Sequence, residues 1–366
     1  MPFDQGNVTF RICALPQAMP DDALERFAAN AAASLEHVRD EPKWGWVSAR
    51  HLLERRIDEE TSVLGGHMHL CLRKAERKIP SALLKAECRM EELSQMAADG
   101  KETLGRKQRK TIKEDVTERL LPQMPPQLSG TYFTIDTSDN VLYVGAASEK
   151  QLEMFLGSFC DVIGFEPVPL VPEVVASEMF EIDPDSIPPL NISPEMGDGD
   201  AAGTLGQSFL TWLWFFQEQR GGVLPQSKLG EFSLMVDGPL TFVAEGAGAF
   251  ESVIRKGMPT VSAEAKAALT VGKKLKQAKV LLMRGQGEEW SLTLDADNFV
   301  FRGLKLPEGE AMDPHSVFDE RMTNLYTFRK VFFALFQRFL KEMGDEGARR
   351  EFQESAKQWV RDRDGK

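Results

Sequence analysis

The sequence predicts an α+β protein whose antiparallel or mixed sheets are flanked by helices, with a projecting helical arm and a second α+β unit. Segments of alternating apolar residues, typical of strands, are interspersed with segments of helical period. Two consecutive helical segments at about 80–122 lie between strands and would form the arm. A Pro/Gly-rich stretch separates two such sets of elements, so we predict an N-terminal unit at 1–170, a linker at 171–206 and a C-terminal unit at 207–366.

The N-terminal unit is expected to begin with a strand at 7–15, where apolar and polar residues alternate. Pro20 and the two aspartates after it start a predicted helix that extends to about Val38. A short aromatic segment at 44–47 and a second strand at 65–72 follow. After the arm, a hairpin and a helix complete this unit, at 131–135, 141–144 and 148–163.

Three potential metal ligands share one face of the second strand, namely His67, His69 and Cys71. No fourth ligand is evident nearby, and residues two apart on a strand are more often packing partners. We therefore predict no metal site and no cofactor.

The arm is predicted from helix start and stop signals. Ser81 would cap a first helix that ends at Gly100. Thr111 and Glu114 have the spacing of a capping box, which predicts a second helix over 112–121 that ends before a proline.

Basic side chains are concentrated between the two arm helices. The segment 101–113 has six cations and one acid, a local charge of +6 − 1 = +5 in a chain of net charge −12. The cations are Lys101, Arg106, Lys107, Arg109, Lys110 and Lys113. They are expected in the joining loop and at the first turn of the second helix. Two interpretations stay open, a phosphate-binding surface and a solvated basic loop on an acidic protein.

The C-terminal unit is predicted to combine a meander of strands with several helices. An aromatic-rich helix begins it, and an amphipathic helix followed by a shorter charged helix ends it as cover for the sheet. A hairpin is expected across Asp237 and Gly238. The helices are placed at 209–219, 262–271, 322–343 and 347–363, and the strands at 232–236, 240–244, 274–283, 290–294 and 299–304.

A second basic group lies in this unit. Its candidate site residues are Arg255, Lys256, Lys273, Lys274 and Lys276, with Lys266 and Lys279 close in sequence. A basic stripe on the sheet and a solvent-facing sheet edge protected by lysines are both consistent with this pattern.

Several short motifs resemble a known family in order and approximate spacing. They are Trp44–Val47, Arg73–Pro80, Lys110–Val116, Leu120–Pro122, Ile135–Thr137 and Val168–Leu170. Together they resemble the bacterial recombination-associated RdgC family over about 44–172. The resemblance reappears at 253–256 and 272–274 and is faint between 172 and 250.

This resemblance implies a nucleoid-associated cytoplasmic protein that binds duplex DNA without sequence preference. It implies a ring-shaped homodimer that encloses the duplex and antagonises the RecA recombinase. Family members tend to have an aromatic residue at the contact between arm tips. The corresponding segment here offers Met124, which we predict as a softer dimer contact.

The family also has an exonuclease label, which the residues do not favour. A metal-dependent nuclease needs carboxylates that converge on a cation. Glu264 and Lys266 form an E-x-K element with Asp237 upstream, but on a predicted helix rather than a strand, and Asp295 and Asp297 are typical of a turn. We therefore expect no enzyme, with a metal-dependent exonuclease as the alternative.

Three features of the sequence lead us to expect a cytoplasmic protein. No run of apolar residues is long enough for a transmembrane helix, and the first thirty residues lack the pattern of a secretory signal. The four cysteines are scattered, as in a reducing cytoplasm.

Overall fold

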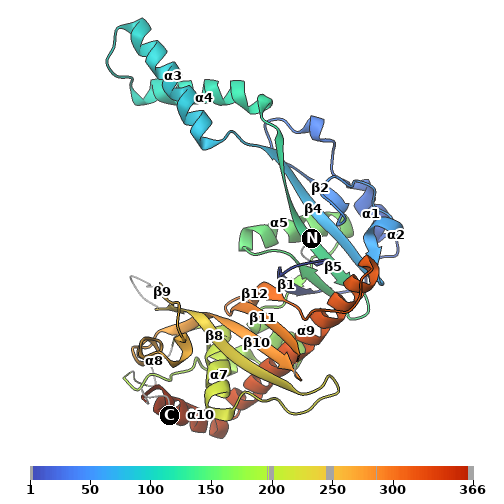
Figure 1. Cartoon of the computed structure of the whole chain (residues 1–366), viewed down its shortest axis with the longest axis vertical. Coiled ribbons are helices and arrows are strands. Elements are labelled where there is room, and N and C mark those ends of the chain that lie inside the picture. The colour runs from blue at the N-terminus through green and yellow to red at the C-terminus, as the bar shows by residue number, and fades with distance from the viewer. Residues whose placement is uncertain (1–2, 196, 198–201, 245–250, 286, 362–366) are drawn as a thin grey trace. The chain divides into compact units, whose positions relative to one another are not determined.

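The computed structural model describes residues 3–195, 197, 202–244, 251–285 and 287–361 (Figure 1). It confirms the α+β class. The chain packs as two compact units. We name them the arm unit, Pro20–Val63 with His69–Tyr132, and the sheet unit, Met1–Met19 and Leu64–Met68 with Phe133–Lys366.

The arm unit places a helical hairpin on a short antiparallel sheet. Strand β2 (Lys43–Ser48) pairs with β4 (His67–Arg77), with Trp46 opposite Leu72. Beyond the ends of β4 and β5 lie the two arm helices (Figure 1). The remaining bounds are α1 (Ala23–Ala29), η1 (Leu35–His37), α2 (Glu59–Ser62), β3 (Val63–Leu64), α3 (Ser81–Asp99), α4 (Arg106–Leu120), η2 (Leu121–Gln123) and β5 (Pro126–Asp136).

The predicted helix from Pro20 to Val38 is wrong beyond Ala29. The alanine-rich segment that follows α1 pairs instead with β2, because the Ala32 N–H donates to the carbonyl of Trp46 over 2.8 Å and the Trp46 N–H donates to Asn30. This approach is close enough that a Cβ at Gly45 would lie 2.4 Å from the Cα of Ala32. Tertiary pairing therefore overrides the helical propensity of the alanines.

The sheet unit contains an antiparallel sheet in the order β5-β6-β1-β12-β11-β10-β8-β9, with β7 on β1. Its first strand, β1 (Val8–Ala14), and the meander β10-β11-β12 lie where the sequence predicts them. The other strands are β6 (Val141–Val144), β7 (Val168–Pro169), β8 (Phe232–Val243), β9 (Glu251–Ile254), β10 (Lys274–Arg284), β11 (Glu288–Asp295) and β12 (Val300–Lys305).

Helices cover this sheet and supply most of the aromatic core. Phe209 on α7 contacts Phe336 on α9 at 4.9 Å between ring centroids, and Trp214 contacts Trp359 on α10 at the same distance. The aromatic helix is therefore buried on several sides, as expected. The helices are α5 (Glu149–Ile163), α6 (Pro172–Val174), η3 (Val175–Met179), η4 (Pro184–Ser186), α7 (Leu205–Arg220), η6 (Pro259–Val261), α8 (Ala263–Thr270), α9 (Pro314–Gly344) and α10 (Glu346–Arg361).

The hairpin predicted across Asp237 and Gly238 is wrong. The whole segment is one strand, β8, which pairs along β10 with register shifts near this point. A Cβ at Gly238 would lie 2.2 Å from the Cγ of Pro259. The glycine is therefore needed for a close approach of η6 rather than for a turn.

The predicted linker at 171–206 contains α6, η3, η4 and the start of α7, and Leu190 and Ile192 are buried. Residues 196 and 198–201 of this segment lie outside the described residues, as do 362 and 363 of the last predicted helix. The division into 1–170, 171–206 and 207–366 as separate domains stays a prediction.

Candidate nucleic-acid interface

The first arm helix ends as the sequence predicts. Gly100 has a left-handed φ of +62°, and its N–H donates to the carbonyl of Met96. The start differs by one residue, because Pro80 occupies the N-cap position and no side chain caps the helix. Ser81 is therefore the first helical residue rather than the cap.

The second arm helix begins earlier than predicted, at Arg106 rather than at 112. Gly105 is its N-cap residue, and the Gly105 N–H donates to the side-chain oxygen of Gln108 over 3.1 Å. Thr111 lies inside the helix and its hydroxyl donates to the carbonyl of Lys107 over 3.3 Å, so the predicted capping box is wrong. Most of the arm cations consequently lie on a helix and not in a loop.

The two arm helices pack through a small apolar core of their own. Ile112, Val116 and Leu120 lie on one face of α4 and are buried with Leu104. Partly buried residues of α3, including Leu84, pack against them. Arg119 forms an ion pair with Glu87 of α3 at 3.0 Å. This core fixes which face of α4 remains exposed.

Arg77 fastens the base of the arm. Its Nε donates to the carbonyl of Val38 over 2.8 Å, and its Nη1 donates to the carbonyls of Pro122, over 3.1 Å, and Met124. One guanidinium at the end of β4 thereby joins three segments of the arm unit. We did not identify this residue as structural from the sequence, where it is one of four basic residues between 73 and 78.

The exposed face of α4 carries a continuous basic stripe. Arg106, Arg109, Lys110 and Lys113 follow the spacing i, i+3, i+4, i+7, which places side chains on one side of a helix. All four are exposed, as is the adjacent Lys107. These five residues span about 10 Å along the helix axis. We call them the arm stripe.

Four members of the arm stripe have no ion pair with another described residue. Lys110 alone has an acidic partner, Glu114 at 3.4 Å on the exposed surface. Lys101 lies outside the stripe, beyond the end of α3, and pairs with Asp99 at 3.0 Å. Since exposed pairs contribute little, the arm stripe is available to an external anion.

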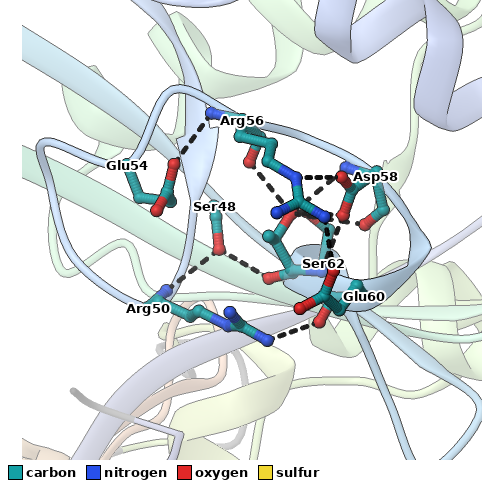
Figure 2. A network of polar contacts seen from close by, with 8 residues as sticks. Ser48, Arg50, Glu54, Arg56, Asp58, Glu60 and Ser62 are labelled. Atoms are coloured by element: carbon teal, nitrogen blue, oxygen red, sulfur yellow. Dashed lines mark hydrogen bonds and ion pairs between the residues drawn. The ribbon is translucent and has the colours of Figure 1, made fainter.

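Arginines elsewhere in the arm unit serve the fold instead. Figure 2 shows the 48–62 segment, where Arg50 donates to the carbonyl of Glu60 over 2.5 Å and Arg56 binds both Asp58 and Glu60. The hydrogen bond from Arg56 lowers the pKa of Asp58, which caps α2 by accepting from the Thr61 N–H. Apart from the exposed Lys110–Glu114 pair, the arm stripe has no such partners among the described residues, which distinguishes it from these structural arginines.

The predicted basic group of the sheet unit is more engaged. Lys273 donates to the hydroxyl of Ser252 over 2.5 Å, and Lys274 donates to the carbonyl of Leu190 over 2.8 Å. Lys276 lies 3.5 Å from Asp297. Arg255 and Lys256 are exposed after β9. Three of these five predicted contacts thus have internal partners, and their role in DNA binding stays a prediction.

The predicted arm-tip position of Met124 is wrong. Met124 follows η2 at the base of the arm and is half-buried, with its carbonyl bound by Arg77. The far end of the arm is the turn at 100–105 between α3 and α4. The role of Met124 as a dimer contact stays a prediction.

Two of the acidic residues considered for a nuclease, Asp295 and Asp297, have structural partners. Glu264 and Lys266 lie on α8, as predicted, where the buried Lys266 donates to the carbonyl of Trp359. Asp295 accepts from Gln277 over 2.8 Å. Asp297 accepts from Thr204 over 2.9 Å at the start of α7.

No group of three or more His, Cys, Asp or Glu side chains is arranged to hold a metal ion within the described part of the chain. Burial raises the pKa of the Cys71 thiol far above its usual value. The same cause raises the pKa of Cys13 to about 12. Both thiols are therefore poor ligands at neutral pH.

Among the helices that the structure describes, none is both long enough and apolar enough to span a membrane.

Comparison with known proteins gives one family match and several relatives. Residues 8–179 match the family model described as "Putative exonuclease, RdgC". A recombination-associated protein RdgC of Pseudoalteromonas atlantica is 34% identical over 126 residues, which cover 34% of this chain and 42% of the relative. Its namesake in Tolumonas auensis is 29% identical over 147 residues, 40% of this chain and 47% of the relative.

The protein of the same name from Yersinia pestis is 29% identical over 130 residues, covering 36% of this chain and 42% of the relative. The chain spans less than half the length of each of these relatives. The matched region contains the whole arm, including the basic stripe on α4. Residues 8–179, just under half of the chain, are therefore similar to the RdgC family, with 29–34% identity to these relatives.

Proposed function

We propose that this protein binds duplex DNA without sequence preference and that the arm stripe on α4 is its main phosphate contact. The proposal rests on four exposed cations along one side of α4, with the exposed Lys107 adjacent to them. All of these residues except Lys110 have no ion pair with another described residue. The stripe's length of about 10 Å corresponds to about three base-pair steps of 3.4 Å. Several phosphates are therefore within its reach.

Contact with phosphates rather than with bases follows from the residue types. Lysine and arginine neutralise phosphates, whereas sequence reading commonly adds asparagine or glutamine at base edges. Gln108 is the one amide side chain on α4, and it is bound to the start of the helix. We therefore expect little discrimination between sequences.

The net charge of −12 does not oppose this proposal. Distant carboxylates are screened because the Debye length is about 8 Å at physiological salt. Segregated charge is what binding requires, and the arm stripe supplies it.

We also propose a homodimer that forms a ring around DNA. Leu83, Met90 and Leu93 are exposed apolar residues on α3, seven and three residues apart, as at a helix–helix seam. Exposed apolar side chains at this spacing support a partner helix on the arm. Met124 at the base is a second candidate contact.

The biological role that we propose is modulation of RecA-dependent recombination and replication. The relatives are named recombination-associated proteins. A protein that covers phosphates without sequence preference would compete with a recombinase for the same DNA. This role places it in the cytoplasm with the nucleoid. We propose no enzymatic activity, and a metal-dependent exonuclease is the alternative.

A salt titration tests the DNA proposal. If about four to six phosphates are neutralised, the slope of log K against log salt should be about −4 to −5 for duplexes of unrelated sequence. The measurement is fluorescence anisotropy with two labelled duplexes of different composition. Binding that ignores salt, or a strong preference for one sequence, would contradict the proposal. Loss of end label in the presence of Mg²⁺ would favour the exonuclease.

Sedimentation velocity tests the dimer. At micromolar concentration we expect a mass near twice the 41.0 kDa of the chain. Replacement of Leu83, Met90 and Leu93 by serine should shift the protein towards monomer, because it removes the apolar seam. A monomeric parent, with and without DNA, would exclude the closed ring.

A further inference from the structure

A groove in the sheet unit is separate from the arm and has no part in the function proposed above. It has a volume of about 460 Å³. Leu224 and Leu229, in the segment between α7 and β8, form one wall. Helix α9 forms the other, where the exposed Ala334 lies between the buried Val331 and Leu335.

The shape of the groove follows from residue size and helical spacing. The lining residues of α9 extend from Lys330 to Arg338, eight residues apart, which is about 12 Å along the axis. Ala334 lies at the midpoint and is exposed, so its small side chain leaves the hollow open. A groove of this length holds about four residues of an extended peptide.

The charges around the groove have one sign. Its lining residues include Lys228, Lys330 and Arg338, and none of the described lining residues carries a carboxylate. Lys330 is paired with Asp139, which lies outside the groove. Lys228 and Arg338 have no ion pair with another described residue, although Arg338 stacks on the ring of Phe216 at 4.7 Å. In a chain of net charge −12, this local excess of cations is a specific feature.

We propose that this groove binds a short acidic and apolar segment of a partner protein. One or two apolar side chains of that segment would fill the space beside Ala334. Its carboxylates would accept hydrogen bonds from Lys228 on one wall and Arg338 on the other. Charge complementarity selects an acidic segment, and the apolar walls disfavour the phosphates of DNA, which would lose hydration there. Apolar anchors in a groove with charged residues at its edge are a general mode of peptide recognition.

The test uses a fluorescein-labelled octapeptide in which aspartate alternates with leucine and phenylalanine. We expect saturable binding to the full chain by fluorescence anisotropy. Two variants of the peptide should fail, one with lysine for each aspartate and one with serine for each apolar residue. The lysine peptide tests charge, and the serine peptide tests burial.

Protein variants locate the peptide. Ala334→Trp fills the hollow and should abolish binding, while Lys228→Glu and Arg338→Glu should each weaken it about tenfold. The control Lys341→Glu changes the same charge on the same helix outside the groove and should bind as the parent does. Since residues 228, 334, 338 and 341 are exposed, all four variants should fold, which thermal unfolding checks.

Three results would overturn the proposal. They are no saturable binding of the acidic peptide, equal binding of the lysine peptide, and parental affinity in both Ala334→Trp and the two charge variants. Dodecanoate provides a further comparison. If it binds in this groove and the peptide does not, the site takes small amphiphiles instead of a protein segment. Duplex binding by Ala334→Trp should equal that of the parent, so failure here leaves the DNA proposal intact.

Discussion

Reversal of Arg106, Lys107, Arg109 and Lys110 to glutamate is expected to lower duplex affinity by at least about 10³-fold at 0.1 M salt. The change takes the net charge from −12 to −12 − 8 = −20 and inverts the arm stripe. Each lost phosphate contact removes about 0.9 from the slope of log K against log salt, so four contacts remove about 3.6. Anisotropy with a labelled duplex measures both quantities.

The same variant should unfold at nearly the parental temperature. The four side chains are exposed and do not contribute to the core between α3 and α4. They also lie in the first two turns of α4, where the helix dipole favours acidic residues. Lost binding with unchanged thermal unfolding would thus separate the contact with DNA from the fold.

A matched control tests whether net charge alone explains the loss. Reversal of Lys150, Lys305, Lys341 and Arg350 changes the net charge equally at exposed positions of the sheet unit. We expect it to retain most of the affinity. Equal loss in this control would mean that long-range repulsion, and not the arm stripe, governs binding.

A second comparison reverses Lys273, Lys274 and Lys276. This variant should lose stability as well, because Lys274 binds the carbonyl of Leu190 and glutamate at 276 would face Asp297. If only this variant lost DNA binding while its fold stayed intact, the DNA-binding surface would be assigned to the sheet unit.

Replacement of Asp139 by alanine is expected to lower the free energy of unfolding by about 2 kcal/mol. Asp139 lies in the turn between β5 and β6 and pairs with Arg329 of α9, whose side chain is 3% exposed. Loss of one partner of a buried pair costs about 3–5 kcal/mol. The loss here should be smaller because the Asp139 side chain is 32% exposed and Asp136 remains 3.8 Å from Arg329.

Urea unfolding near neutral and acidic pH measures this effect and its pH dependence. Hydrogen bonding from Lys330, with the charge of Arg329, lowers the pKa of Asp139 in the folded protein. The stabilisation is therefore present above the unfolded pKa of about 3.9 and is lost as the pH falls through the lower folded value. The difference between parent and variant should narrow below about pH 4. If the difference in unfolding free energy between parent and variant did not change with pH, the Asp139–Arg329 pair would not be its source.

The control for this prediction is Lys330→Ala. Lys330 also pairs with Asp139, at 3.0 Å, but its side chain is 44% exposed. We expect a loss of less than about 1 kcal/mol. A larger loss from Lys330→Ala than from Asp139→Ala would show that the exposed pair holds α9 to the turn.

The sequence predicted those elements whose local signals agree with their packing. Ser148 is the N-cap of α5, and Gly100 is the C-cap of α3. Elsewhere a contact between residues distant in sequence determined the secondary structure. The alanines after α1 pair with Trp46, and Gly238 makes room for Pro259 inside a continuous strand. Neither contact leaves a local pattern that could have revealed it.

The candidate site was predicted as a set of residues but not as a surface. The capping-box spacing of Thr111 and Glu114 suggested a loop before residue 112. Gly105 and Gln108 provide the actual start, and this extends α4 through the cations. Their i, i+3, i+4, i+7 spacing was present in the sequence. This spacing indicates a shared helix face only when the helix is known to begin at Arg106.

Site-specific photo-crosslinking tests the central claim most directly, because it locates the DNA without relying on affinity. Benzoylphenylalanine in place of Thr117 would lie one turn beyond Lys113, in line with the arm stripe, and would leave every cation in place. The same residue in place of the exposed Ser355 on α10 is the control. We predict a crosslink to labelled duplex from position 117 and none from 355. A crosslink from 355 alone would contradict the assignment of the arm as the DNA-binding surface.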